Sequence, residues 1–173
     1  PLTEYAGLVL AGLGADVYLV EPPQGSATRQ RNPRVPGAGD SPRASIAFLS
    51  RNTNKKSVVI DASNSDDRNL LDRLIERSDV LIKSSDSELA SCVDDETIPT
   101  VVTVTDRRRL GTSSIVSFAA SGGLASSGWP HQAPCNAPSW LALDGTSIYA
   151  ATMALMGTLA YRRGGGLMRY EIP

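Results

Sequence analysis

The chain has 173 residues, and its 17 lysines and arginines nearly balance its 18 aspartates and glutamates. This balance lacks the excess of one sign that a nucleic-acid binder or a polybasic membrane binder shows, so we expect neither partner. With 41% hydrophobic residues the chain can bury a core, and its length suits one domain or part of a larger one.

Small apolar residues predict a short buried helix over residues 5–13, with Gly14 as its stop. Apolar residues at helical spacing predict a second helix over 65–77. Runs of β-branched and apolar residues predict four strands, over residues 16–20, 57–61, 79–82 and 101–104. The alternation predicts an α/β fold with a Rossmann-like parallel sheet and flanking helices, in which ligands bind beyond the carboxyl ends of the strands.

Between these elements lie a long segment rich in Gly, Pro and Arg over 24–40 and a polar turn over 51–56. A loop as long as 24–40 in a compact domain is usually functional or mobile. Because sheets of this kind bind ligands beyond the carboxyl ends of their strands, the loops after Val20, before Ser57 and after Ile82 are the places to expect a ligand. A long helix is predicted over 148–161, closed by two arginines and three glycines.

The longest apolar run of the chain belongs to this last helix. It falls short of the ~20 residues that a membrane span needs. The two cysteines, Cys92 and Cys135, stand far apart and outside any CxxC motif, so neither a disulfide scaffold nor a zinc site is indicated. We therefore expect a soluble protein, and the simplest compartment for it is the cytoplasm.

Few residues suggest catalysis when they are considered singly. Glu21 ends a strand, as a ribose-binding acid does, but the glycines at 12–14 precede that strand without GxGxxG spacing, so NAD is not expected. His131 is the single histidine and GxSxG is absent, which excludes a serine triad and a histidine metal site. Asp144 stands just before the long helix, where a carboxylate can be structural or chemically active.

Five basic residues of the loops could either hold phosphates or form a solvated face. They are Arg29, Arg31, Arg34, Lys55 and Lys56. From the spacing alone both interpretations stay open.

The motifs taken in order resemble the family III CoA-transferases, the group of formyl-CoA transferase and carnitine CoA-transferase. The run YAGLVLAGLGADVYLVEPP at 5–23 is similar to that family's YAGxxLAxLGADVxxVEPP. The later matches follow in the family's order: 25–29 to GDxTR, 52–58 to NRNKRSV, 70–81 to LLxxLxxxADVxV, 119–129 to AxSGxxxxTG, and 144–163 to the catalytic Asp, its helix and the RR terminus. The resemblance covers nearly the whole chain.

The resemblance implies a mechanism and a set of site residues. In that family an Asp carboxylate attacks an acyl-CoA thioester, giving a mixed anhydride and then an aspartyl-CoA thioester, from which CoA passes to a carboxylic acid. The matching residue is Asp144. Arg29, Asn54 and Lys55 match loops that contact CoA, and Ser84 belongs to the segment that replaces a CoA-contacting ENFRPG loop. The expected substrates are acyl-CoA and an acceptor acid, without a metal or NAD.

The resemblance also implies an architecture. Residues 1–173 are expected to form the large Rossmann-like domain, apparently partial, without the family's small second domain. An interlocked homodimer is expected from the family as well, in which two ring-shaped chains pass through each other.

Two other functions remain as hypotheses. An α-methylacyl-CoA racemase would need a His and an Asp where this chain aligns Ser113 and Ser114, and neither serine has a pKa suited to general-base work near neutrality. A non-catalytic CoA-binding paralogue is favoured by the divergent segment 83–87 and by a length of about half that of the family.

Overall fold

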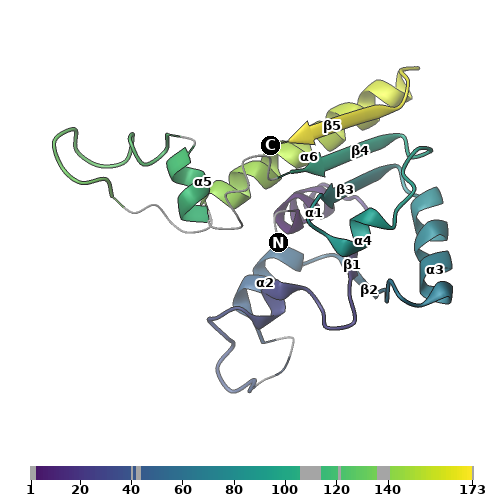
Figure 1. Cartoon of the computed structure of the whole chain (residues 1–173), viewed down its shortest axis with the longest axis horizontal. Helices are drawn as coiled ribbons and strands as arrows, with labels where there is room; N and C mark the ends of the chain where they lie inside the picture. Colours follow the sequence, from purple (N-terminus) through teal and green to yellow (C-terminus); the bar gives the residue numbers. More distant parts are fainter. Residues whose placement is uncertain are drawn as a thin grey trace.

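The computed structural model describes residues 3–39, 41, 44–105, 114–120, 122–135 and 141–172. Its strands pair in parallel and form two sheets. The first sheet joins β1 (Tyr18–Glu21) to β2 (Lys56–Val59), and the second has the order β3 (Val80–Ser84), β4 (Thr100–Val104), β5 (Met168–Ile172). Figure 1 shows the strands side by side with helices around them, which confirms the predicted α/β class.

The helices, in chain order, are α1 (Glu4–Gly12), the short 3₁₀ helix η1 (Ala27–Gln30), α2 (Ile46–Asn52), α3 (Ser65–Glu76), α4 (Glu88–Ser91), α5 (Ser114–Ala120) and α6 (Leu141–Arg162). The start of α3 follows the expected chemistry, because the Asn64 side chain accepts a hydrogen bond from the Asp66 amide and two aspartates occupy the first turn.

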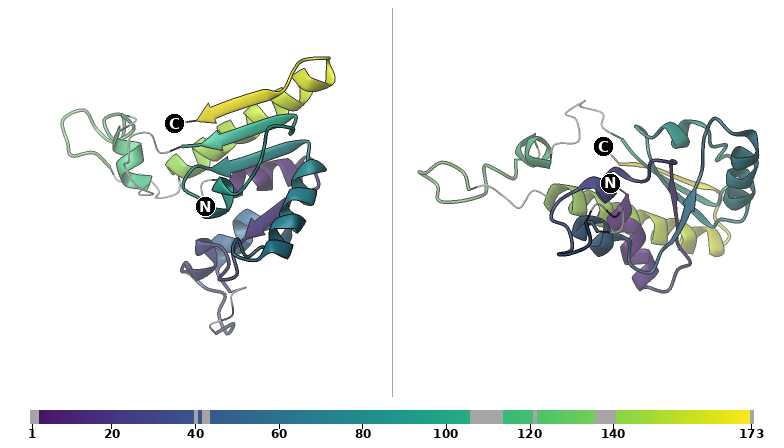
Figure 2. Two further views of the ribbon diagram at one scale, coloured as in Figure 1. Left: turned by 45° about the vertical axis from the view of Figure 1, so that its right-hand side comes forward. Right: turned by 90° about the horizontal axis from the view of Figure 1, so that it is seen from below.

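The core lies on both faces of the second sheet, with β4 at its centre. On one face Val102 and Val104 pack with residues of α1 and α6, and on the other Val101 packs with Leu71 and Ile75 of α3. The strand reads as a near-continuous apolar run because both of its faces are covered. In Figure 2, α1 and α6 lie on one side of the strands and α3 on the other.

Close contact between α6 and the sheet depends on small residues. Ala150, Ala151 and Ala154 are buried in the core, and one turn further a Cβ added to Gly157 would lie 2.5 Å from Cγ2 of Thr100. The helix therefore approaches β4 more closely than any larger residue at position 157 allows. Residues 122–135, by contrast, extend away from the body of the molecule (Figure 1).

Two expectations about the elements were wrong. Part of the predicted polar turn over 51–56 is helical, since α2 runs to Asn52. The long helix begins at Leu141 rather than near Ile148, so Asp144 lies inside its first turn and not before it. In both places the local residues lack a clear helical pattern of apolar residues, and the two helix ends meet through the ion pair of Arg51 and Asp144, which are distant in sequence.

Candidate active site

The loop after β1 is organised around the carboxylate of Glu21, which is 2% exposed. Nε and Nη2 of Arg29 each donate to it at 2.7 Å, Oγ of Ser57 donates at 2.6 Å, and the Ser26 amide donates at 2.8 Å. Burial alone raises the pKa of Glu21, but these hydrogen bonds outweigh it and lower the pKa to about 2. Glu21 is therefore an ionised structural anchor for the loop.

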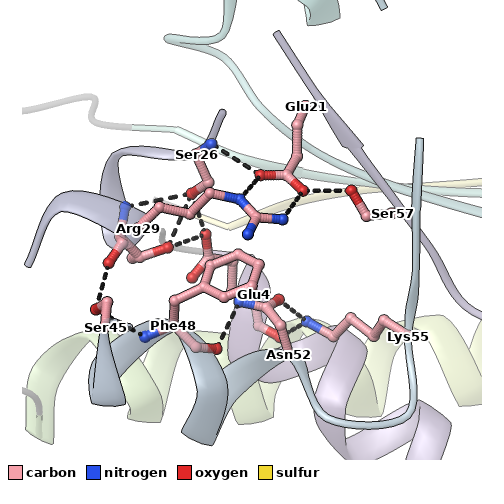
Figure 3. Close-up of polar contacts among 10 residues, drawn as sticks. Glu4, Glu21, Ser26, Arg29, Ser45, Phe48, Asn52, Lys55 and Ser57 are labelled. Carbon is pink, nitrogen blue, oxygen red and sulfur yellow. Dashed lines mark hydrogen bonds and ion pairs between the residues drawn. The ribbon is translucent and has the colours of Figure 1, made fainter. Parts of the chain in front are cut away.

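A second buried carboxylate, Glu4 of α1, ties the same loop to the first helix. Its Oε1 accepts hydrogen bonds from the hydroxyls of Ser26 and Thr28. Its Oε2 is buried and has no hydrogen-bond partner among the described residues. The loop after β1 is thus held from the strand by Glu21 and from the helix by Glu4 (Figure 3).

Lys55 approaches this arrangement from the segment before β2. Its Nζ donates to the backbone oxygen of Glu4 and to Oδ1 of Asn52 at 2.6 Å. Burial lowers the pKa of Lys55 to about 8, although the nearby charges of Glu4 and Glu21 act in the opposite direction. The ammonium group faces inward, as Figure 3 shows.

Helix α2 lies against this loop. The Ser45 side chain accepts from the Phe48 amide at the helix start and donates to the Thr28 carbonyl at 2.7 Å. The guanidinium carbon of Arg29 lies 3.7 Å from the centroid of the Phe48 ring, a cation–π contact. The helix and the loop after β1 therefore hold each other in place.

At its other end, α2 contacts the predicted nucleophile. Nη2 of Arg51 donates to Oδ1 of Asp144 at 3.1 Å and to Oδ2 at 3.3 Å, and both side chains are 16% exposed. The Asp144 carboxylate thus faces α2 from the first turn of α6, where the helix dipole favours a negative charge. A half-buried carboxylate can act as a nucleophile toward an acyl-CoA thioester.

The remaining predicted residues differ in their surroundings. Asn54 is exposed and has a φ of 65°, the left-handed conformation with which Asn can end a helix, here just after α2. Ser84 is half-buried at the end of β3, and within the described part of the chain no hydrogen bond joins it to the loop of Glu21. Arg29 and Lys55, by contrast, belong to one polar cluster.

A pocket of about 420 Å³ opens at the carboxyl ends of the strands. It is lined by Pro22–Gln24 after β1, by Ile60–Ser63 after β2 and by Ser87–Leu89 beyond β3. This is the position at which doubly wound sheets bind ligands. Two of the three loops singled out from the sequence, those after β1 and after β3, contribute to it.

Sequence reasoning missed Arg51, whose partner lies 93 positions away. It also missed Glu4, which is buried in the structure and which the sequence shows as an acid at the start of an apolar helix. His131 is exposed in the extended segment, and Ser113 lies outside the described residues. Among the residues that the structure describes, no group of three or more His, Cys, Asp or Glu is arranged to hold a metal ion. Within that same part of the chain, no helix is long and apolar enough to cross a membrane.

Comparison with known proteins identifies the class. A sequence model described as CoA-transferase family III matches residues 2–91, just over half of the 173 residues. The probable fatty acyl-CoA transferase Rv3272 of Mycobacterium tuberculosis is 38% identical over 79 residues, which are 46% of this chain and 19% of that protein. The succinyl-CoA:mesaconate CoA-transferase of Haloarcula hispanica is 36% identical over 80 residues, 46% of this chain and 20% of that protein.

A solved structure shares the fold. A CaiB/BaiF family protein from Brucella suis superposes with a TM-score of 0.80 at 24% identity, over 98% of this chain and 48% of that one. The chain belongs to CoA-transferase family III. It spans about half the length of this solved relative, and the matched stretch is about a fifth of each curated relative.

Proposed function

We propose that this chain is the nucleophile-bearing, Rossmann-like part of an enzyme that transfers CoA from an acyl-CoA to a carboxylic acid through an aspartyl-CoA thioester at Asp144. The family match supports CoA transfer in general. The observation that carries the finer proposal is the Asp144 carboxylate, 16% exposed in the first turn of α6 and facing α2, which also contacts the Arg29 loop.

The chemistry divides a difficult exchange into reversible steps. A carboxylate oxygen of Asp144 attacks the thioester carbonyl, the carbon–sulfur bond breaks, and CoA thiolate leaves a mixed anhydride. The thiolate then attacks Cγ of Asp144, which releases the donor acid and forms the aspartyl thioester. The acceptor carboxylate repeats these steps in reverse, so Asp144 is regenerated without net proton or electron transfer.

For CoA itself we propose contacts from Arg29, Asn54, Lys55 and Ser84. Asn54 is exposed and Ser84 half-buried, so both are open to a ligand. Arg29 and Lys55 already bind buried partners, so contact with a phosphate requires them to exchange part of those bonds. The pocket beyond β1, β2 and β3 is the natural position for the nucleotide end of the cofactor.

The relatives suggest which compounds to test. Succinyl-CoA and a fatty acyl-CoA such as octanoyl-CoA are the first donors to offer, and mesaconate is the first acceptor, because the names of two relatives contain these substrate classes. The purified protein is incubated with each donor and hydroxylamine. We expect an aspartyl hydroxamate at Asp144, identified by peptide mass spectrometry.

Substitution of the nucleophile is the complementary test. Asp144→Ala should abolish CoA transfer and hydroxamate formation, and should leave the affinity for CoA within a few fold, because the carboxylate is not among the proposed CoA contacts. Isotope exchange between labelled CoA and acyl-CoA measures transfer, and calorimetry measures CoA affinity. Unimpaired turnover in this variant would show that Asp144 is not the nucleophile.

The alternatives give different outcomes. CoA binding without any hydroxamate supports the non-catalytic paralogue, which the divergent segment 83–87 favours. Loss of deuterium from an α-labelled 2-methylacyl-CoA without CoA exchange supports the racemase. We also propose the family's interlocked homodimer; light scattering of the purified protein tests whether it is a dimer.

A further inference from the structure

The ion pair between Arg51 and Asp144 places a guanidinium group directly on the proposed nucleophile. Nη2 contacts both carboxylate oxygens, and Nε lies 3.4 Å from Oδ1. Within the described residues the Asp144 carboxylate accepts hydrogen bonds from Arg51 alone. Both side chains are 16% exposed, so each charge depends on the other in a poorly solvated place.

This pairing cannot persist through the proposed reaction. When Asp144 becomes an anhydride or a thioester it loses its negative charge, and Arg51 is left half-buried without a counter-charge. A half-buried guanidinium without a partner is unfavourable, and arginine cannot lose its proton to avoid this. The reaction itself supplies a replacement in the thioester state, since formation of the aspartyl thioester releases the carboxylate of the donor acid from Cγ of Asp144, and the acceptor carboxylate then attacks the same carbon atom.

We propose that Arg51 exchanges partners during catalysis: it binds Asp144 in the resting enzyme, and it binds the carboxylate of the donor or acceptor acid while Asp144 carries CoA. This inference rests on the proposed function. The planar fork of arginine suits either carboxylate in the same two-point geometry, which a lysine ammonium does not reproduce. Arg51 is thus a substrate-binding residue that selects acids.

The position of Arg51 is set by the rest of the site. It lies in the last turn of α2, whose first turn is capped by Ser45 and whose Phe48 ring lies against Arg29. The next residue, Asn52, accepts from Lys55. The guanidinium is therefore carried on a short helix fixed at both ends, so it can change partners without a change in backbone.

A binding experiment tests the exchange without turnover. Asp144→Asn mimics the uncharged, covalently modified side chain and leaves Arg51 without its carboxylate. We expect this variant to bind propionate at least about tenfold more tightly than the unsubstituted protein does, as measured by calorimetry. It should show no such gain in affinity for the uncharged analogue propionamide. The double variant Arg51→Ala, Asp144→Asn should lose the gain. Equal propionate affinity in Asp144→Asn and the unsubstituted protein would overturn the inference.

Kinetics give an independent readout. Arg51→Ala should raise the KM for the acceptor acid by about tenfold or more, Arg51→Lys should recover only part of that loss, and added guanidinium should restore activity to Arg51→Ala. The matched control is Arg73→Ala, an exposed arginine of α3 whose Nε donates only to the Asn69 carbonyl among the described contacts. A merely structural role predicts no rescue by guanidinium.

The transferase reaction at Asp144 and the exchange of carboxylates on Arg51 can each be wrong without the other test being affected. If the unsubstituted protein forms no hydroxamate at Asp144, the proposed transferase reaction is wrong whatever the propionate measurement shows. If hydroxamate forms but Arg51→Ala leaves the acceptor KM unchanged, the transferase assignment stands and the exchange of carboxylates on Arg51 is wrong.

Discussion

Glu21 illustrates how one buried carboxylate can organise a loop. Its two oxygens accept from a guanidinium, a hydroxyl and an amide, and these donors come from two separate segments of the chain, the loop after β1 (Arg29 and Ser26) and β2 (Ser57). A buried charge is tolerated only when its hydrogen-bonding capacity is filled, as it is here. The loop that carries Arg29 therefore depends on an acid that itself contributes no chemistry.

Removing this charge should be costly. Glu21→Gln keeps the shape but leaves the Arg29 fork facing a neutral amide, which we expect to lower the free energy of unfolding by about 3 kcal/mol. Urea denaturation followed by circular dichroism measures the loss. The control is Asp16→Asn, which breaks the exposed pair of Asp16 and Lys56 and should leave the stability nearly unchanged. If Glu21→Gln and Asp16→Asn lose the same free energy of unfolding, burial does not make the Glu21 ion pair more important than the exposed one.

The contact between α6 and β4 shows what determines the position of a helix. The faces meet through alanines and Gly157, and the nearest neighbour of that glycine is the β-branched side chain of Thr100, which is buried and stiff. This contact fixes the distance between α6 and the sheet. It also fixes the position of Asp144 in the first turn of α6. The packing of α6 therefore determines where the proposed nucleophile lies.

Substitutions within α6 test this packing. Gly157→Ala would place a Cβ 2.5 Å from Cγ2 and 2.9 Å from Oγ1 of Thr100, so we expect destabilisation of about 1–2 kcal/mol despite the better helix propensity of alanine. Gly145→Ala, on the same helix with no neighbour within 4 Å of the added atom, should be neutral or stabilising. Thermal unfolding compares the two. Stabilisation by both substitutions would refute the close approach.

Taken over the whole molecule, the buried charges make stability depend on pH at both ends of the scale. Glu21 has a pKa of about 2 in the fold against 4.5 for an ordinary glutamate, so its contribution is complete above pH 4.5 and is lost as the pH falls toward 2. Lys55 has a pKa of about 8 against 10.5, so the penalty for burying its charge is relieved as the pH rises from 8 to 10.5.

We therefore predict a urea midpoint that falls between pH 4.5 and 2 and rises between pH 8 and 10.5. Glu21→Gln should remove most of the fall between pH 4.5 and 2, and Lys55→Met should remove the rise between pH 8 and 10.5. Because the charge of Glu21 raises the pKa of Lys55, Glu21→Gln should also lower the pKa of Lys55 further and make the alkaline rise larger. If the urea midpoint of Lys55→Met still rises between pH 8 and 10.5, the rise is due to another titrating group.

Much of the fold was predictable from local patterns. The helices at Glu4–Gly12 and Ser65–Glu76 and the strands β1 to β4 fall within about two residues of the expected ranges, because their apolar residues follow the helical or extended period and their ends carry the usual cap and stop residues. The order of motifs was also enough to indicate the family, which the comparison confirms. These helices, strands and family motifs are determined by residues that lie close together in the sequence.

The site itself depends on contacts that no local pattern contains. Arg51 meets Asp144 across 93 positions, and Glu4 meets Thr28 across 24, so neither partner can be inferred from its neighbours in the chain. Helix α2 lacks a clear apolar period, and it is stabilised by Thr28 and Arg29 of another segment. Periodicity therefore decides which elements form, while close packing between them decides which charges are paired, buried and able to react.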